Sequence, residues 1–158
     1  MNDEWRTPIA ELNLVHRVLE RIETDPCSTL LANQVVNAKQ FYTKEMNSLN
    51  KTWTGPVFLN PPYSRELIKL FADKMTQEHL TRGVEGIMLV NASTDTEWFH
   101  KLMNVASAVC FNKGRIAFEG ESGTKRGNPR GQAYFLFGRT YLEKFKLEFM
   151  NRGKVVLL

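Results

Sequence analysis

Two short apolar runs, at residues 57–59 and 86–90, constrain the fold more than any other feature, because a segment with helical periodicity follows each of them. An apolar run without polar alternation is typical of a strand that is buried on both faces. A strand–helix–strand–helix order is typical of a three-layer α/β domain with a parallel sheet. In such sheets, ligands bind beyond the carboxyl ends of the strands.

The first helix is expected to begin at Thr7-Pro8. Threonine is a good N-cap, and proline at the first helical position gives up only a donor that has no partner. An apolar stripe at steps of three and four residues supports this helix and comprises Ile9, Leu12, Val15, Leu19 and Ile22. Residues 24–55 are polar and are expected to be irregular.

The other predicted elements form a mostly parallel sheet with an antiparallel, hairpin-like edge. They are helices at 65–81 and 140–151, a helix that Thr94 or Asp95 caps and that runs through about Met103, and strands at 107–111, 115–118, 133–137 and 155–158. Ser64 is the expected cap of the helix at 65–81, and Gly83 is its expected stop. The chain has 158 residues, of which 42% are hydrophobic. Residues 1–158 are therefore expected to form a single domain.

Positive charge gathers at the end of the chain. Residues 125–158 carry eight lysines and arginines against two glutamates, a local charge of +6 out of a net +4 for the chain. One-sided basicity suggests a polyanionic partner. A solvated basic helix explains the same charge equally well.

No targeting or metal-binding pattern is found. No apolar stretch reaches the ~18 residues of a membrane helix, and the first residues do not look like a secretory signal. Cys27 and Cys110 fall neither in a CxxC motif nor at zinc-ligand spacing with a histidine. We therefore expect free thiols, a cytoplasmic protein and no metal.

The tetrapeptide Asn60-Pro61-Pro62-Tyr63 directly follows the first buried strand. Two consecutive prolines fix two φ angles and remove two backbone donors, so the turn is stiff. It is expected to leave Asn60 Oδ1 and the Pro61 carbonyl free as acceptors beside the flat Tyr63 ring. Two acceptors and an aromatic wall suit a planar group that carries an NH2. A rigid turn without chemical function is the alternative interpretation.

Such a turn can make an aromatic amine reactive. The amine is a poor nucleophile, because its lone pair is delocalised into the ring. Two acceptors that hold both N–H bonds favour a pyramidal nitrogen and localise the lone pair for attack on an electrophilic methyl group. Tyr63 would stack on the base. This catalysis rests on positioning and electrostatic stabilisation and needs no separate strong base.

The segment Asp25-Pro26-Cys27-Ser28 is a second candidate site. A carboxylate before a rigid proline at the start of a loop can anchor the amino group or the hydroxyls of a cofactor. Taken alone, the segment is more readily explained by an Asx-type turn that ends the first helix.

Six blocks in order make the whole chain recognisable. They are DEWRTP at 3–8, DPCS at 25–28, FLNPPYS at 58–64, TDTEWFH at 94–100, FNKGRIAF at 111–118 and GNPRGQ at 127–132. Over nearly its whole length the chain resembles the phage DNA N6-adenine methyltransferase family, the small Dam-like enzymes of bacteriophages and prophages. The resemblance implies a trimmed Rossmann-like methyltransferase fold, a three-layer sandwich.

The resemblance also implies the chemistry. S-adenosylmethionine would be the methyl donor, and adenine in double-stranded DNA would be the acceptor. The implied catalytic residues are Asn60, Pro61, Pro62 and Tyr63. The implied cofactor-binding residues are Trp5, Thr7, Pro8, Asp25, Pro26, Cys27 and Asn60. The family makes GATC the expected target sequence.

Adenine N6 lies inside the duplex, so such enzymes flip the base out. The polar loop at 119–132 holds four of the ten glycines and is a candidate for reaching DNA, although a hairpin tip without function is an equal alternative. The expected DNA-binding residues are Arg115, Lys125, Arg126, Asn128 and Arg130. Arg115 is expected to face the cleft while Ile116 and Phe118 face the core.

The chain departs from the family pattern in two ways. The segment 28–32 has no glycine where the cofactor motif usually enters a glycine-rich turn. Asp25 and Asn60 are also only 35 positions apart, so two crossover units do not fit between them and the sheet is expected to be trimmed. Glu45 is a weak candidate for the carboxylate that would hold the cofactor ribose. Trp98 is expected in the core.

Two other functions remain open. The same turn occurs in enzymes that methylate another planar amine, protein glutamine or RNA guanine. A catalytically inactive DNA-binding decoy, which blocks restriction sites, would keep the fold and lose turnover.

Overall fold

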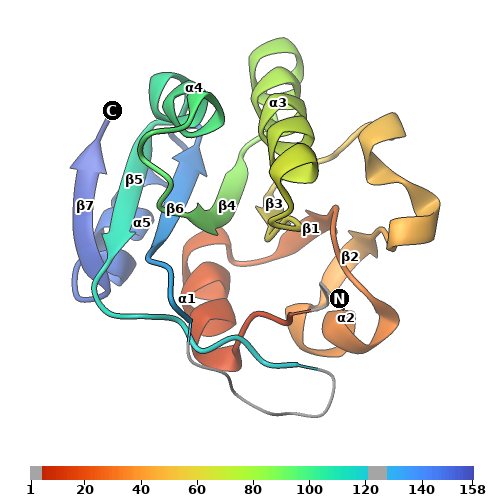
Figure 1. The fold of residues 1–158 in the computed structure, drawn as a ribbon, viewed down its shortest axis with the longest axis horizontal. Helices are drawn as coiled ribbons and strands as arrows, with labels where there is room; N and C mark the ends of the chain where they lie inside the picture. Colours follow the sequence, from red (N-terminus) through yellow and green to blue (C-terminus); the bar gives the residue numbers. More distant parts are fainter. Residues whose placement is uncertain (1–4, 121–127) are drawn as a thin grey trace.

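The computed structural model describes residues 5–120 and 128–158, which form one seven-stranded sheet between two layers of helices (Figure 1). The strands are β1 (Ile22–Asp25), β2 (Ala38–Phe41), β3 (Val57–Leu59), β4 (Gly86–Asn91), β5 (Ala108–Asn112), β6 (Gln132–Phe137) and β7 (Gly153–Leu157). The helices are α1 (Ile9–Leu19), α2 (Leu30–Val36), α3 (Arg65–Arg82), α4 (Glu97–Val105) and α5 (Leu142–Phe149), with two 3-10 turns at Lys44–Met46 and Ser48–Asn50.

The sheet has the order β2-β1-β3-β4-β6-β5-β7 and two halves of different kind. The pairs β1–β2, β1–β3 and β3–β4 are parallel, whereas β4–β6, β5–β6 and β5–β7 are antiparallel. The expected α/β sheet with parallel and antiparallel parts is confirmed. The antiparallel part is wider than the predicted edge. The chain passes from β5 to β6, and β6 inserts between β4 and β5 and pairs with both.

Two hydrophobic layers form on the two faces of the sheet. Along β4, Ile87 and Leu89 pack against α1 and α5, and Met88 and Val90 pack against α3 and α4. Because both faces are covered, β4 is buried over nearly its whole length, as its continuous apolar run predicts. Figure 1 shows α3 and α4 together beside the centre of the sheet.

The segment between β1 and β3 is more regular than expected. It contains α2, whose first turn is capped by the Thr29 hydroxyl accepting from Ala32 N at 3.0 Å, and the edge strand β2. Asn37 ends α2 in the left-handed conformation with φ 55°, and the Asn33 side chain bonds the backbone of Ala38. The prediction of an irregular segment is wrong, because an edge strand needs no apolar run. Two crossovers lie between Asp25 and Asn60, one from β1 to β2 through α2 and one from β2 to β3, because β2 and β3 both run parallel to β1. The prediction that two such connections do not fit there is therefore wrong.

The first helix is shorter than predicted. Glu20 adopts φ 66° and ends α1 at Leu19, so Ile22 opens β1 instead of continuing the helical stripe. Ile9 is 61% exposed and does not belong to the core. Pro8 occupies the N-cap position, and Thr7 makes no capping bond, so the predicted cap is wrong.

Residues 115–118 are extended but pair with no strand, so the strand predicted there is wrong. The only pairing near them in the described ranges is an antiparallel bridge between Arg6 and Glu119. The helix predicted with Thr94 or Asp95 as its cap begins at Glu97, and its cap is Thr96 instead. Gly83 ends α3 with φ 70°, as predicted, while Ser64 stands at the N-cap without a side-chain bond. The remaining predicted elements agree with the structure to within a few residues.

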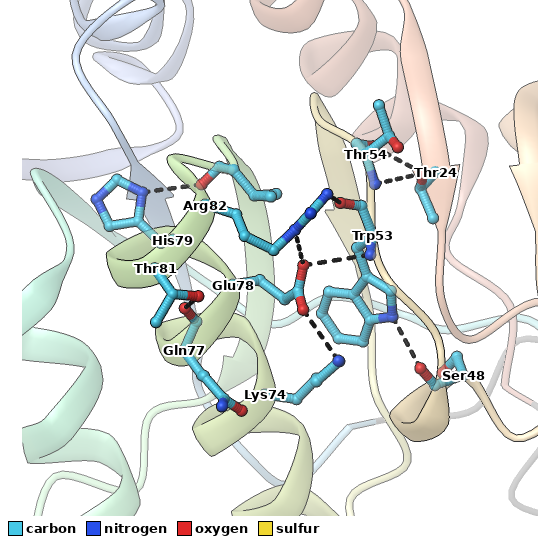
Figure 2. Close-up of polar contacts among 11 residues, drawn as sticks. Thr24, Ser48, Trp53, Thr54, Lys74, Gln77, Glu78, His79, Thr81 and Arg82 are labelled. Atoms are coloured by element: carbon cyan, nitrogen blue, oxygen red, sulfur yellow. Dashed lines mark hydrogen bonds and ion pairs between the residues drawn. The ribbon is translucent and has the colours of Figure 1, made fainter.

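A buried carboxylate ties the connection before β3 to helix α3 (Figure 2). Glu78 accepts from Trp53 N at 3.2 Å, Lys74 Nζ at 3.0 Å and Arg82 Nε at 3.1 Å. The fully buried Trp53 also donates its indole N–H to the Ser48 carbonyl at 2.9 Å. Burial alone would raise the pKa of Glu78, but these hydrogen bonds and the two cations lower it below its usual value. The network fixes how the chain returns from the β2 edge to β3.

Replacing Glu78 by glutamine is expected to lower the free energy of unfolding by about 2 kcal/mol, because two cations and a buried N–H lose their charged acceptor. The pKa of this carboxyl is lowered in the folded state. The stabilisation is therefore present above the unfolded pKa of about 4.3 and fades as the pH falls below it. Urea denaturation at pH 7 and pH 3.5 measures both effects. E66Q, on the exposed first turn of α3, is the control. Equal destabilisation by E66Q and E78Q would contradict the network.

Candidate functional site

Three parallel strands bring the predicted motifs to one edge of the sheet. Asp25 ends β1, Asn60 directly follows β3, and Asn91 ends β4. Neighbouring parallel strands have their carboxyl ends at the same edge, which is where α/β sheets bind ligands. The segment predicted to bind the cofactor and the stiff turn at Asn60 therefore lie side by side.

The side-chain amide of Asn60 is fixed at both ends. Its Nδ2 donates to Thr7 Oγ1 at 2.9 Å, which joins two blocks that lie 53 residues apart in the sequence. Its Oδ1 accepts from the Tyr63 hydroxyl, which also lies 3.1 Å from the Leu89 carbonyl oxygen. Thr7 thus bonds the site rather than the cap of α1, and its hydroxyl accepts from the NH2 end of the Asn60 amide.

The expectation of two free acceptors is half right. Within the described residues, the Pro61 carbonyl takes part in no hydrogen bond, but Asn60 Oδ1 is occupied by Tyr63. The Tyr63 ring meets Phe118 edge to face, with ring centroids 6.4 Å apart. Burial, with a smaller contribution from the nearby Cys27, raises the pKa of the Tyr63 hydroxyl well above its usual value. Tyr63 is therefore a neutral donor.

Asp25 is only 4% exposed and forms a tight turn at the end of β1. Its Oδ1 accepts from Cys27 N at 3.1 Å, so the Asx-type turn exists but ends a strand rather than the first helix. Burial raises the pKa of Asp25 to about 7. Burial and the neighbouring Asp25 charge also raise the pKa of the Cys27 thiol, which keeps it protonated. Within the described part of the chain, no cation pairs with Asp25.

A cavity of about 370 Å³ lies on the other side of the stiff turn, between the beginnings of α3 and α4. It is lined by Tyr63, Arg65, Ile68, Asn91, Ser93, Trp98 and Arg130. The prediction of a core position for Trp98 is wrong, because Phe99, which is 2% exposed, takes that position on α4. Trp98 is only partly buried and packs edge to face on Phe99, with centroids 5.8 Å apart.

The structure places three of the five predicted DNA-binding residues near this cavity. Arg130 lines it, and Asn128 Oδ1 accepts from Arg130 N at 3.0 Å, which shapes the turn. Arg115 is exposed while Ile116 and Phe118 are buried, but Arg115 does not line the cavity, so its predicted position at the cleft stays a prediction. A Cβ atom on Gly131 would lie 2.9 Å from Arg115 Nη1, so glycine allows that close approach. Lys125 and Arg126 lie outside the described residues.

The positions of the remaining predicted residues are as follows. Trp5 is 40% exposed, and Pro8 stands at the start of α1 beside Thr7. Glu45 lies on an exposed 3-10 turn after β2. In the tail, Lys144 pairs with Glu20 and Lys146 with Glu143, so these charges are partly neutralised within the chain.

Sequence reasoning missed an amide pair beside the cavity. Gln132 is 1% exposed and donates from Nε2 to Asn91 Oδ1 at 2.8 Å, while its own Oε1 has no partner in the described structure. The only sequence signal is the position of Gln132 at the end of the GNPRGQ block.

Comparison with known families agrees with this arrangement. The family model described as DNA N-6-adenine-methyltransferase (Dam) matches residues 1–156. The chain belongs to this family. The Dam family implies DNA as the substrate and S-adenosylmethionine as the methyl donor. The comparison with curated proteins finds no match.

Neither a metal cluster nor a membrane helix is found in the described ranges of this Dam family member. Residues 5–120 and 128–158 contain no group of histidine, cysteine and carboxylate side chains that could hold a metal ion. In the same ranges, no helix is long and apolar enough to cross a membrane.

Asp25 predicts an unusual pH dependence of stability. Its unfolded form loses its proton near pH 3.9, whereas the folded form keeps it until about pH 7. Between these values the native state binds more protons than the unfolded state, so its stability falls as the pH rises, by about 4 kcal/mol in total. D25N does not undergo this change. The free energy of unfolding of D25N, measured by urea denaturation, is therefore expected to rise relative to that of the wild type between pH 4 and pH 8.

The matched control is D95N, an exposed aspartate before α4, which should follow the wild-type profile. Parallel pH profiles for the wild type and D25N would show that Asp25 titrates normally.

Proposed function

We propose that the chain is a site-specific DNA methyltransferase that transfers a methyl group from S-adenosylmethionine to N6 of an adenine flipped out of duplex DNA. The observation that supports it most is the oriented Asn60 amide. Thr7 holds Nδ2, so Oδ1 faces a donor, and in this structure the Tyr63 hydroxyl is that donor. The amine of an adenine would take the same position.

The proposed catalytic step uses the acceptors of the stiff turn. Tyr63 moves off Asn60, and N6 donates one N–H to Asn60 Oδ1 and the other to the Pro61 carbonyl. Both bonds favour a pyramidal nitrogen with a localised lone pair. The Tyr63 ring stacks on the base, and Pro61 and Pro62 keep the acceptors in place. Because the amide is fixed before the substrate arrives, little reorganisation is needed during the reaction.

The cofactor would lie on the Asp25 side of Asn60. When bound, S-adenosylmethionine supplies an electrophilic methyl group. Asp25 fits such a ligand, because it is a buried carboxylate without a cation partner in the described structure and can accept from an amino group or hydroxyls. We propose Trp5, Thr7, Pro8, Pro26 and Cys27 as the other cofactor-binding residues. A ligand that carries positive charge would bind better as Asp25 ionises, so affinity should rise through pH 7.

DNA would approach from the cavity side. Arg130 lines the cavity, Asn128 bonds the backbone of Arg130, and the Arg115 guanidinium lies beside Gly131. We propose that these three residues, with Lys125 and Arg126, contact the DNA backbone or base edges. The tail cations are weaker candidates, because Lys144 and Lys146 already have acidic partners.

A catalytically inactive decoy is the second candidate. The observation that favours it is the Tyr63 hydroxyl, which occupies the Asn60 acceptor. Protein glutamine and RNA guanine are disfavoured as acceptors by membership of the Dam family.

The direct test is transfer of labelled methyl from S-adenosylmethionine to unmethylated duplex DNA, followed by nucleoside analysis. N6-methyladenine is expected, and N60A should lower the rate about 100- to 1,000-fold, because it removes a preorganised polar group at the reacting centre. N104A, which removes an exposed asparagine on α4, should keep the wild-type rate. Label in cytosine or a fully active N60A would sink the mechanism, and DNA binding without any methylation would favour the decoy.

Salt dependence tests the DNA-binding loop. The triple replacement of Lys125, Arg126 and Arg130 by glutamine should weaken DNA binding and flatten the slope of log K against log salt, by about one unit for each phosphate that the loop no longer neutralises. The double variant K144Q/K146Q should change the slope little. Binding isotherms at several salt concentrations measure both. A larger change in the double variant would move the DNA surface to the tail.

A further inference from the structure

The cavity beside Tyr63 combines features that suit one kind of ligand. Tyr63 and Trp98 give it aromatic walls, and Arg65 and Arg130 are exposed cations at the same cavity. Its volume of about 370 Å³ lies within the usual range for small-ligand sites. Flat aromatic rings stack on nucleobases, and guanidinium groups bind phosphate through two parallel hydrogen bonds.

Core packing explains only part of the position of Trp98, because the half-buried ring packs against the core and also lines the cavity. Thr96 caps α4 by accepting from Phe99 N at 3.3 Å, and Phe99 then enters the core and packs on Phe135, with centroids 5.1 Å apart. Trp98, one residue earlier on the helix, is directed to the cavity instead. Trp53 uses its indole N–H inside the protein, whereas no hydrogen bond of the described residues uses that of Trp98. A large ring with a polar edge is thus left available at the cavity.

The hydrogen bond between Gln132 and Asn91 determines which end of the Asn91 side chain can bond a ligand in the cavity. Gln132 holds Asn91 Oδ1, which leaves the NH2 group of Asn91 to donate to an occupant. Gln132 Oε1, which has no partner within the described residues, is buried beside this pair, and such an atom is unusual in a native interior. Asn91 is the last residue of β4, at the edge of the sheet where Asn60 also lies, so a ligand held here reaches the stiff turn past Tyr63.

We propose that this cavity binds the extruded nucleotide of the DNA, with its base stacked on Trp98, its phosphate on Arg65 and Arg130, and a ring nitrogen accepting from Asn91. Trp98 is then a second surface on which the base stacks. Its role differs from that of Tyr63, whose hydroxyl must also leave Asn60 Oδ1 before the amine can bind there. The inference rests on the proposed function and assigns residues to its substrate.

The test is a thermodynamic cycle that combines Trp98→Leu with deletion of the target base. Two duplexes are compared. One carries the adenine that the wild-type protein methylates, mapped first by sequencing, and the other carries an abasic site at that position. On the adenine duplex, W98L should raise the Kd about 5- to 150-fold, the range for removing one stacking partner from a base. On the abasic duplex there is no base to stack, so W98L should change the Kd less than about 2-fold.

W98F keeps an aromatic ring and should restore binding of the adenine duplex to within about 3-fold of the wild type. This variant separates stacking from packing, and thermal unfolding of both variants shows whether they fold. An equal rise in Kd for W98L on the two duplexes would show that Trp98 only supports the fold, and would overturn the inference. So would a W98F variant as weak as W98L.

Arg65→Gln tests the phosphate contact. R65Q should raise the Kd on both duplexes alike, since both keep the phosphate, and should reduce the salt slope by about one unit. R139Q is the matched control, because Arg139 is exposed after β6, at the opposite end of the sheet. An R65Q variant that behaves like R139Q would remove the phosphate contact from the proposal.

Different results would contradict the proposed function and the proposed nucleotide site. If the wild-type protein forms no N6-methyladenine in any duplex, the proposed function fails and this inference falls with it. If it methylates adenine but the cycle shows no coupling between Trp98 and the base, only this inference fails.

Discussion

The hydrogen bonds of the Asn60 amide organise the site. Thr7 comes from the start of α1 and Tyr63 from the start of α3, and these helices lie on opposite faces of the sheet. One small side chain therefore fixes the position of both helices at the strand edge. In this arrangement the NH2 end of the amide bonds Thr7 and the carbonyl end bonds Tyr63, so a donor meets the amide from the Tyr63 side.

The insertion of β6 between β4 and β5 gives this edge its stability and its shape. β6 pairs with both neighbours and is buried along its whole length. Its first residue, Gln132, reaches Asn91 at the end of β4, and the backbone of Gly131 accepts from Ala92 N at 2.9 Å. The segment that leads into β6 is thus held against the strand end where the cavity lies. A true hairpin at the edge of the sheet would have placed Arg130 far from Tyr63.

The motifs and their neighbourhood could be predicted, because parallel strands bring their carboxyl ends together and the order of elements sets which strands are parallel. Buried strands such as β4 were also predictable from unbroken apolar runs. The edge strand β2 was not, since half of its residues face solvent, and residues 115–118 look like a strand yet find no partner. The choice between Trp98 and Phe99 depends on where α4 begins, and the cap lies one or two residues later than predicted. The use of the Thr7 hydroxyl depends on a contact across 53 residues. No local sequence pattern predicts the cavity position of Trp98 or the hydrogen bond between Thr7 and Asn60.

The bridge between Arg6 and Glu119 joins the two ends of the proposed machinery. Two backbone hydrogen bonds, at 2.8 and 3.1 Å, connect the residue before Thr7 to the entrance of the glycine-rich loop, and the Arg6 side chain adds a bond to the Gly120 carbonyl at 3.1 Å. Glu119 cannot shift without breaking these bonds or pulling Arg6 along, and Arg6 is covalently joined to the residue that orients Asn60. A displacement of Glu119 is therefore transmitted to the residue before Thr7, so the loop that we propose to bind DNA and the acceptor of the proposed catalytic turn share one piece of backbone.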